Sequence, residues 1–260
     1  AVGLEQAANL AVKGADPLVA VDCLNGGNPE KPDVFGGVRA AVHGLADMLA
    51  DLGVPVVGGN VSLYNDSDHG PVPPTPTTFM LGRTPDLAVP PTIAVADAAV
   101  CLLGDPVAGG VAGRLGGSEL FARLDAAGRF PELPDDPAAV VDAIVAAARH
   151  EATLATHDVA HGGLVTALAE MIAPDVGLEV EVAADGHPLE VGFHERPGRA
   201  VVVTTDPTGL AHAVGSTLAV EPIGQTTADG RLRASLGGEE LDLAAATVAE
   251  WRDLLPRSLD

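Results

Sequence analysis

Two short segments carry residue types that could bind a phosphate group or a metal ion. Asp22 follows the apolar run 18–21, and Gly58-Gly59-Asn60-Val61-Ser62 follows the apolar run 54–57. If both runs are neighbouring strands, Asp22, Asn60 and Ser62 converge at one edge of a sheet, where α/β proteins bind ligands. Carboxylate and amide oxygens suit Mg²⁺, and bare glycine backbone lets phosphate approach closely. The alternative is an ordinary Gly-Gly-Asn turn between two strands, with Asp22 capping a turn and Ser62 on a half-exposed strand.

Two further segments precede predicted helices. The first is Gly116-Gly117-Ser118-Glu119, and the second is His157-Asp158 followed by Gly162-Gly163. Free N–H groups and the positive end of the helix dipole favour an anion at such positions. Ser118 as an N-cap and His157 as a buried, hydrogen-bonded histidine are the alternatives. These residues therefore either bind phosphate or have a structural role.

Several common catalytic patterns are absent from the sequence. There is no Gly-x-x-x-x-Gly-Lys-Ser/Thr loop, no Gly-x-Ser-x-Gly elbow, no His-Glu-x-x-His and no Gly-x-Gly-x-x-Gly after a strand. Cys23 has no histidine nearby in sequence to activate it, so we interpret it as a packing residue. A phosphate site in this chain must be of another kind.

The composition predicts a globular protein with an acidic surface. The chain has 260 residues, 47% of them apolar, which is enough for one large or two smaller domains. The formal charge of -22 argues against nucleic acid or an anionic membrane as a partner, and with only two lysines it indicates adaptation to a salty cytoplasm. Two cysteines and no apolar run of about 18 residues favour a cytoplasmic location.

Hydrophobic periodicity predicts alternating strands and helices, and hence an α/β fold in two domains. Three prolines without periodicity between 83 and 97 place a linker there, so the predicted domains are residues 1–90 and 97–258. The chain begins inside a helical pattern, so the N-terminal domain is expected to be incomplete. The predicted strands are 18–22, 54–57, 61–64, 77–81, 98–103, 177–182, 200–204, 219–224 and 231–236, and the predicted helices are 34–52, 119–127, 137–150, 164–172, one after 206–207 and one around 243–255.

The segment from Asp22 to Pro32, followed by Gly59-Asn60-Val61-Ser62-Leu63-Tyr64-Asn65, closely resembles phosphoribosylformylglycinamidine synthase of purine biosynthesis. Pro74-Thr75-Pro76, Leu115 to Glu119 and His157-Asp158 with Gly162-Gly163 match that family in the same order. The family belongs to the aminoimidazole ribonucleotide synthase-like superfamily, whose units pair two α/β domains, the first forming part of a shared barrel. The resemblance is to the second of two tandem units. Asn25-Gly26-Gly27-Asn28 departs from the usual Asn-Phe-Gly-Asn, which should reduce packing in that loop, and His161 replaces a frequent aspartate.

The resemblance implies roles for individual residues. Asp22 and Gly59 correspond to ATP-contacting positions, Asn60 to a magnesium ligand and Ser62 to a contact with the ribonucleotide substrate. The implied reaction uses ATP, Mg²⁺ and glutamine-derived ammonia to convert formylglycinamide ribonucleotide into its amidine.

The implied partners are the N-terminal half of the synthetase, a glutaminase subunit and a small bridging subunit. The catalytic histidine is expected in the N-terminal half, so the isolated chain is predicted to be inactive. Two alternatives remain: a non-catalytic half that binds nucleotide to stabilise an assembly, and a kinase-like enzyme of the same superfamily.

Overall fold

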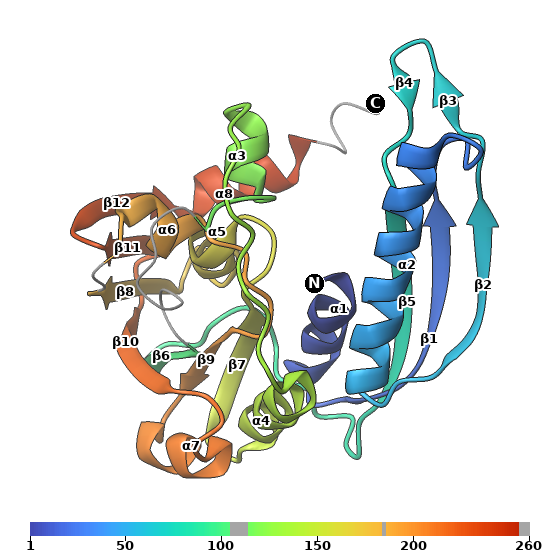
Figure 1. Ribbon diagram of the computed structural model, residues 1–260. Coiled ribbons are helices and arrows are strands. Elements are labelled where there is room, and N and C mark those ends of the chain that lie inside the picture. Colours follow the sequence, from blue (N-terminus) through green and yellow to red (C-terminus); the bar gives the residue numbers. More distant parts are fainter. Residues whose placement is uncertain (105–113, 184–185, 255–260) are drawn as a thin grey trace.

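The computed structural model describes residues 1–104, 114–183 and 186–254. Its first part is a three-stranded sheet in the order β2-β1-β5, in which β1 runs parallel to β2 and antiparallel to β5 (Figure 1). A small hairpin joins β2 to β5. The elements of this part are α1 (Val2–Ala11), β1 (Asp16–Asn25), α2 (Pro32–Asp51), β2 (Val56–Ser62), β3 (Asp66–Ser67), β4 (Gly70–Pro71) and β5 (Thr75–Arg83).

The second part is a seven-stranded mixed sheet in the order β12-β11-β8-β10-β6-β9-β7. One face packs against α5, α6 and α8, and the β6–β9 region of the other face packs against α4 and α7. The elements of this part are β6 (Ala99–Leu103), α3 (Glu119–Arg123), α4 (Pro137–Arg149), β7 (Thr153–Asp158), α5 (Gly163–Glu170), β8 (Gly177–Val182), α6 (Pro188–Phe193), β9 (Ala200–Thr204), α7 (Pro207–Val214), β10 (Val220–Thr227), β11 (Arg231–Leu236), β12 (Glu239–Ala244) and α8 (Ala245–Arg252).

Helix α1 lies between the two sheets and contacts α4 on one side and α2 and β5 on the other (Figure 1). Leu4, Ala7, Ala8 and Ala11 are completely or almost completely buried. Alanine side chains allow the close approach of neighbouring helices, so one hydrophobic core continues from the first sheet, through α1, to the α4 face of the second sheet.

The predicted α/β architecture is confirmed, but several element predictions were wrong. Strand β1 does not end at Asp22 but continues to Asn25, and β2 includes Gly58 and Gly59. The elements β7, α6 and β12 had no predicted counterpart. The β3–β4 hairpin had no predicted counterpart either. Residues 255–258, the predicted end of the second domain and of its last helix, lie outside the described residues.

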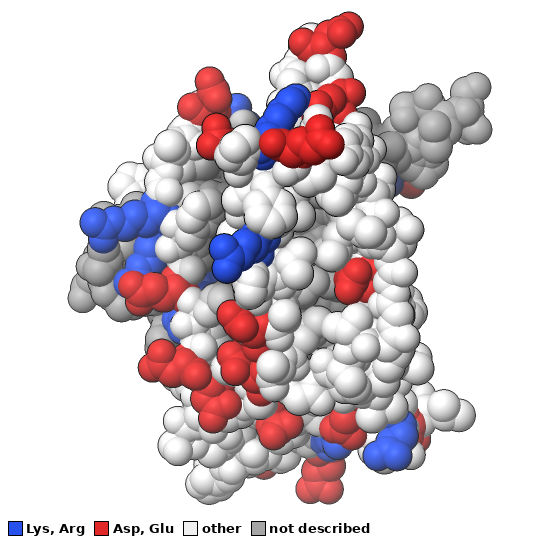
Figure 2. Space-filling view, turned by 45° about the vertical axis from the view of Figure 1, so that its right-hand side comes forward, with Lys and Arg blue, Asp and Glu red and all other residues white. Residues whose placement is uncertain are grey.

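The two faces of the first sheet differ in their surroundings. Ala20 and Met80 point toward the helices and are buried, whereas Phe79 and Leu81, next to Met80 in β5, are 65% and 54% exposed. In the described residues no element covers this outer face. The part of the surface where this sheet lies also carries few charged side chains (Figure 2). Such an exposed apolar face is typical of an interface.

No helix in the described part of the chain is long and apolar enough to cross a membrane.

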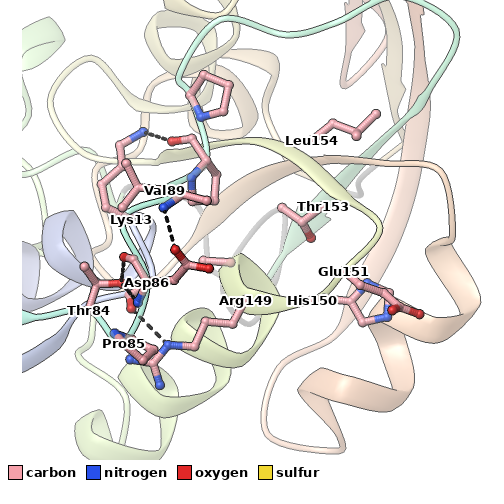
Figure 3. A pocket seen from close by; sticks show the side chains of 15 residues that line it. Lys13, Thr84, Pro85, Asp86, Val89, Arg149, His150, Glu151, Thr153 and Leu154 are labelled. Carbon is pink, nitrogen blue, oxygen red and sulfur yellow. Dashed lines mark hydrogen bonds between the residues drawn. The ribbon is translucent and has the colours of Figure 1, made fainter.

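Lys13, in the turn after α1, connects that helix with the second part of the chain. Its Nζ donates to the backbone oxygen of Pro90 at 3.1 Å, to Thr92 Oγ1 at 3.0 Å and to the backbone oxygen of Thr156 at 3.4 Å. Burial lowers the pKa of this ammonium group, although Asp158 opposes the shift. Nearby, Arg149 Nε donates to the backbone oxygen of Gly14. The hydrogen bonds with Pro90 and Thr92 hold the linker. Lys13, Gly14, Pro90 and Arg149 line a cavity of about 450 Å³ (Figure 3).

We expect Lys13→Met to destabilise the chain by about 1–3 kcal/mol, because it leaves three partly buried acceptors without their charged donor. Lys31→Met is the matched control, since Lys31 is the other lysine and pairs with Asp66 on the surface at 2.7 Å. An exposed pair of this kind contributes little to stability, because solvent screens it. Chemical denaturation would measure both variants, and equal losses would show that Lys13 does not hold the linker.

Candidate functional site

Asp22 and Gly59 lie side by side in the middle of the parallel pair β1–β2. The register pairs them directly, and a Cβ atom on Gly59 would lie 2.5 Å from Asp22 Oδ1 and 2.9 Å from the Asp22 backbone oxygen. Any side chain at Gly59 would therefore displace the carboxylate. Gly58 differs, because the nearest atom to its Cβ position is Val21 Cγ1 at 3.8 Å. Of these two glycines, only Gly59 must lack a side chain to leave room for the Asp22 carboxylate.

Asn60 and Ser62 lie on the opposite face of the sheet. Successive residues of a strand alternate between faces, and the register pairs Cys23 with Asn60 and Asn25 with Ser62. Asn60 is exposed, with its Nδ2 3.8 Å from Cys23 Sγ. Asp22, Asn60 and Ser62 are therefore close in register but lie on two faces of the sheet, with Asp22 facing the helices and the other two facing outward. Their convergence on one site stays a prediction.

The turn alternative for Gly58-Gly59-Asn60 was wrong, since these residues belong to β2. The true turn follows Ser62. There the Tyr64 N–H donates to Gly27 and the Asn65 N–H donates to Gly26, while Asn65 Nδ2 donates to the backbone oxygens of Gly26 and Ser62. The loops after β1 and β2 therefore form one hydrogen-bonded unit at the carboxyl end of the parallel pair.

The replacement of a frequent phenylalanine by Gly26 does not leave this loop loosely packed. Gly26 is buried, and its Cβ position is 2.8 Å from Val38 Cγ2 and 3.5 Å from Leu63 Cδ2. Because these two side chains occupy the space, the predicted loss of packing is wrong.

A complete magnesium site is not formed by the described residues. No group of three or more His, Cys, Asp or Glu side chains among them could hold a metal ion. Asn60 offers one neutral amide oxygen on the outer face, and Asp22 is on the other face. Since Mg²⁺ in proteins is bound through carboxylates and substrate phosphates, Asn60 could be a ligand only if carboxylates came from elsewhere.

The two segments predicted before helices meet at Glu195. Its Oε1 accepts from the N–H of Glu119 at 2.9 Å and from the N–H of Gly162 at 2.8 Å. Ser118 is confirmed as the N-cap of α3, because its Oγ accepts from the N–H of Phe121. One backbone N–H at each of the two helix starts is thus already bound to a carboxylate of the chain. Sequence reasoning missed Glu195, which is 33 and 76 residues away from its partners.

The glycines of these segments are needed for close backbone packing. Gly117, Gly162 and Gly163 have positive φ angles of 77°, 74° and 66°. A Cβ on Gly116 would lie 2.3 Å from the backbone oxygen of Gly128, and one on Gly163 would lie 2.7 Å from that of Gly192. These contacts account for the glycines without a ligand.

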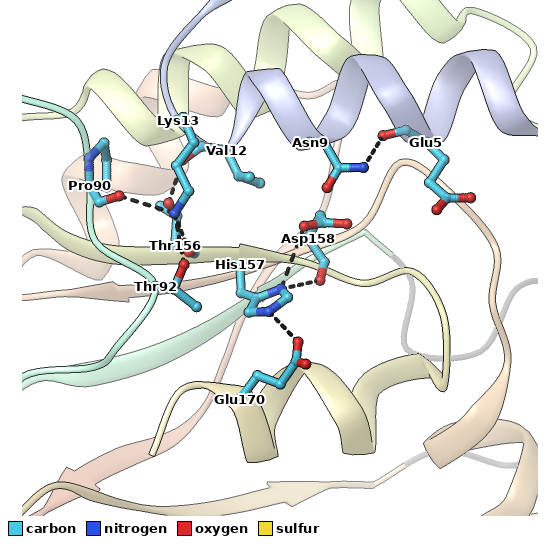
Figure 4. A network of polar contacts seen from close by, with 10 residues as sticks. All are labelled: Glu5, Asn9, Val12, Lys13, Pro90, Thr92, Thr156, His157, Asp158 and Glu170. Atoms are coloured by element: carbon cyan, nitrogen blue, oxygen red, sulfur yellow. Dashed lines mark hydrogen bonds and ion pairs between the residues drawn. The ribbon is translucent and has the colours of Figure 1, made fainter. Parts of the chain in front are cut away.

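His157 lies between two carboxylates (Figure 4). Its Nε2 is 2.8 Å from Glu170 Oε2, and its Nδ1 is 2.7 Å from the backbone oxygen of Asp158 and 3.5 Å from Asp158 Oδ1. Burial by itself would lower the pKa of His157, but the hydrogen bonds with Asp158 and Glu170 outweigh burial and raise it to about 9. The hydrogen bond with His157 lowers the pKa of Glu170. A cationic imidazole at neutral pH is no general base, so the geometry favours the structural alternative.

Glu5 of α1 brings another carboxylate close to this region. Burial raises its pKa, the neighbouring Asp158 and Glu195 add to that shift, and His161 opposes it. Helix α1 therefore contributes to the electrostatics at the start of α5 as well as to the core.

Comparison with known families gives two matches that together span most of the chain. Residues 4–84 match the AIR synthase related protein N-terminal domain, and residues 98–237 match the AIR synthase related protein C-terminal domain. The chain belongs to the AIR synthase related family.

Within this family, curated relatives resemble the whole chain. Phosphoribosylformylglycinamidine synthase subunit PurL of Natronomonas pharaonis is 51% identical over 260 residues, covering 100% of this chain and 36% of that protein. The PurL subunit of Halorubrum lacusprofundi is 50% identical and covers 100% of this chain and 34% of that protein. The AIR synthase related chain thus spans about a third of the length of these relatives.

Solved structures share the fold. Thermotoga maritima PurL complexed with FGAR has a TM-score of 0.69 at 18% identity, covering 92% of this chain and 40% of that one. The PurL complex with ATP has a TM-score of 0.67 at 16% identity, covering 93% and 39%. A HypE–HypF complex has a TM-score of 0.65 at 15% identity and covers 93% of this chain and 82% of that one. At these identities the likeness shows the AIR synthase related fold alone.

Gly59→Ala should destabilise the protein by about 1–3 kcal/mol, because the new methyl group overlaps the Asp22 carboxylate and backbone. Gly58→Ala in the same strand is the matched control and should change stability by about 0.5 kcal/mol or less. Denaturant titration of both variants would test this expectation, which a similar loss in both would contradict.

Stability should fall with rising pH because of His157. Folding raises the pKa of His157 from 6.5 to about 9. The protonated imidazole therefore stabilises the folded protein fully below pH 6.5, and this contribution is lost as the pH rises toward 9. Because the Glu170 side chain is 45% exposed and partly screened, we expect a loss of about 1–2 kcal/mol.

Thermal unfolding between pH 6 and 9.5 would measure this loss. His157→Gln should reduce the dependence of thermal stability on pH, whereas His43→Gln, on the exposed side of α2, should leave this dependence unchanged. An unchanged slope in His157→Gln would show that other groups cause the pH dependence.

Proposed function

We propose that this chain is the second half of a phosphoribosylformylglycinamidine synthetase. The match to PurL at 51% identity over all 260 residues carries the proposal. The proposed reaction forms formylglycinamidine ribonucleotide from formylglycinamide ribonucleotide, ATP and ammonia derived from glutamine. In it, phosphorylation would activate the amide oxygen of the substrate, and ammonia would then displace phosphate.

The proposed residue roles follow the two faces of the first sheet. Asn60 and Ser62 point outward, so as a magnesium ligand and a substrate contact they would act in a site formed with a second body. Asp22 and Gly59 would contact ATP from the other side of β2. Because β2 is an edge strand, a ligand can reach both faces around it. This arrangement supports a site shared between two halves rather than one enclosed in this chain.

The exposed outer face supports the N-terminal half of the synthetase as the first partner. Val19, Val21, Phe79 and Leu81 share this face, and Phe79 and Leu81 are more than half exposed. Packing an equivalent sheet of the other half against it would remove this apolar surface from water.

We further propose a glutaminase subunit and a small bridging subunit as partners. The chain resembles the PurL part of a structure described as PurLQS from Thermotoga maritima, with a TM-score of 0.65 at 17% identity. In this chain Cys101 is buried, with a pKa raised to about 11 by burial. That thiol is a poor nucleophile at neutral pH, and Cys23 has no histidine nearby in sequence to activate it, so we propose that ammonia comes from another chain.

The acidic surface supports a salty cytoplasm as the proposed location. The chain carries 36 acidic and 14 basic residues, and a high salt concentration would screen the repulsion among the acidic ones.

A second candidate function is a half that binds nucleotide without taking part in catalysis. The observation that favours it is the separation of Asp22 from Asn60 and Ser62 onto opposite faces. This candidate would be supported if the chain bound Mg-ATP tightly and substitutions of Asp22, Asn60 and Ser62 left turnover unchanged.

Reconstitution would test the proposed function. The isolated chain should be inactive, and adding the N-terminal half should restore ammonia-dependent ATP hydrolysis in the presence of the ribonucleotide. In the reconstituted enzyme Asn60→Ala and Asp22→Asn should lower turnover by about tenfold or more without unfolding the protein.

Asn9→Ala is the matched control for Asn60→Ala, since Asn9 lies on the exposed side of α1 and bonds only to the backbone oxygen of Glu5 within the described residues. If the reconstituted pair hydrolysed no ATP, the proposed function would be wrong. Full activity of Asn60→Ala would instead remove Asn60 from the site.

A further inference from the structure

Tyr64 combines an unfavourable backbone conformation with an exposed ring. Its φ angle is 62°, in the left-handed region that a bulky side chain rarely adopts, and the residue is 60% exposed. The other non-glycine residues with positive φ in the described chain are Asp97 and Asp125. Aspartate tolerates this region because its short polar side chain can bond locally, whereas tyrosine has no such compensation.

The surrounding loops impose this conformation. The Tyr64 N–H donates to the backbone oxygen of Gly27 at 3.1 Å, and its own backbone oxygen accepts from the N–H of Asp66 at 3.0 Å. The next residue, Asn65, donates through its Nδ2 to the backbone oxygens of Gly26 and Ser62. Glycine would satisfy the same backbone bonds without strain. Since the ring is largely exposed, burial within this chain does not offset the strain.

The position of Tyr64 suggests what the ring contacts. It lies two residues after Ser62, beyond the carboxyl ends of the parallel strands β1 and β2, where ligands bind in α/β sheets. Strained residues that are held firmly by their surroundings are concentrated at ligand sites. An aromatic ring offers a flat surface that stacks on a base or covers a ribose.

We propose that the Tyr64 ring is a binding contact for a nucleotide in the site shared by the two halves. This inference rests on the proposed function and adds a residue to its site. The nucleotide is either ATP, through its purine, or the ribonucleotide substrate, through its ribose, and the ring rather than the phenol hydroxyl provides the contact.

The test uses the reconstituted synthetase and three variants. Tyr64→Gly removes both the ring and the strain, Tyr64→Phe keeps the ring, and Asp97→Gly places glycine at another position with positive φ. Calorimetry with a non-hydrolysable ATP analogue and, separately, with formylglycinamide ribonucleotide gives the two affinities, and thermal unfolding gives Tm.

Tyr64→Gly should raise Tm by about 2–4 °C and weaken the binding of one of the two nucleotides about tenfold. Tyr64→Phe should keep both affinities within about twofold, and Asp97→Gly should change neither affinity. The nucleotide that loses affinity is the one that the ring contacts.

Unchanged affinity of Tyr64→Gly for both nucleotides would overturn this inference and leave the proposed function intact. If Tyr64→Gly weakened only the association of the two halves, the inference would be overturned too, since the ring would then contact the partner protein. If the unmodified enzyme bound neither nucleotide, the proposed function itself would fail.

Discussion

The burial of α1 is the constraint on which the rest of the structure depends. This helix is packed between two sheets that belong to different parts of the chain, and its buried face is made of one leucine and several alanines. Because the core runs through α1 without interruption, the two sheets cannot move independently unless this core opens. Lys13 and Arg149 extend the connection beyond α1 through hydrogen bonds to backbone oxygens. The position of the first sheet relative to the second is therefore fixed by packing rather than by the linker.

A firmly held first sheet gives its outer face a defined shape for a partner. The helices cover one side, so the residues that alternate toward the other side form an apolar surface with Asn60 and Ser62 at its edge. The pleat of the strands thus divides the candidate ligand contacts into two groups. A site with contributions from both faces requires an edge strand, and β2 is one.

In the second sheet the polar groups with the most suggestive sequence patterns bind to one another. Glu195 accepts one backbone N–H from each of two glycine-containing segments, and Glu170 and Asp158 hold the imidazole of His157. Buried or half-buried polar groups require partners, and here the chain supplies them itself. These patterns stabilise the arrangement of α3, α5 and β7 and do not require a ligand to be explained.

The sequence by itself determined the α/β class, most of the longer helices and strands, the Ser118 N-cap and the motifs that identify the family. Those features depend on local periodicity, on cap and turn chemistry and on residue order, all of which can be seen in the linear chain. Only the tertiary structure decided which face Asp22 and Asn60 occupy, that Glu195 joins two distant loops, and that Tyr64 is strained. These features depend on strand register, on contacts between residues far apart in sequence and on the conformation of a loop held by another loop. They arise only when distant segments are packed together, so no local pattern could reveal them.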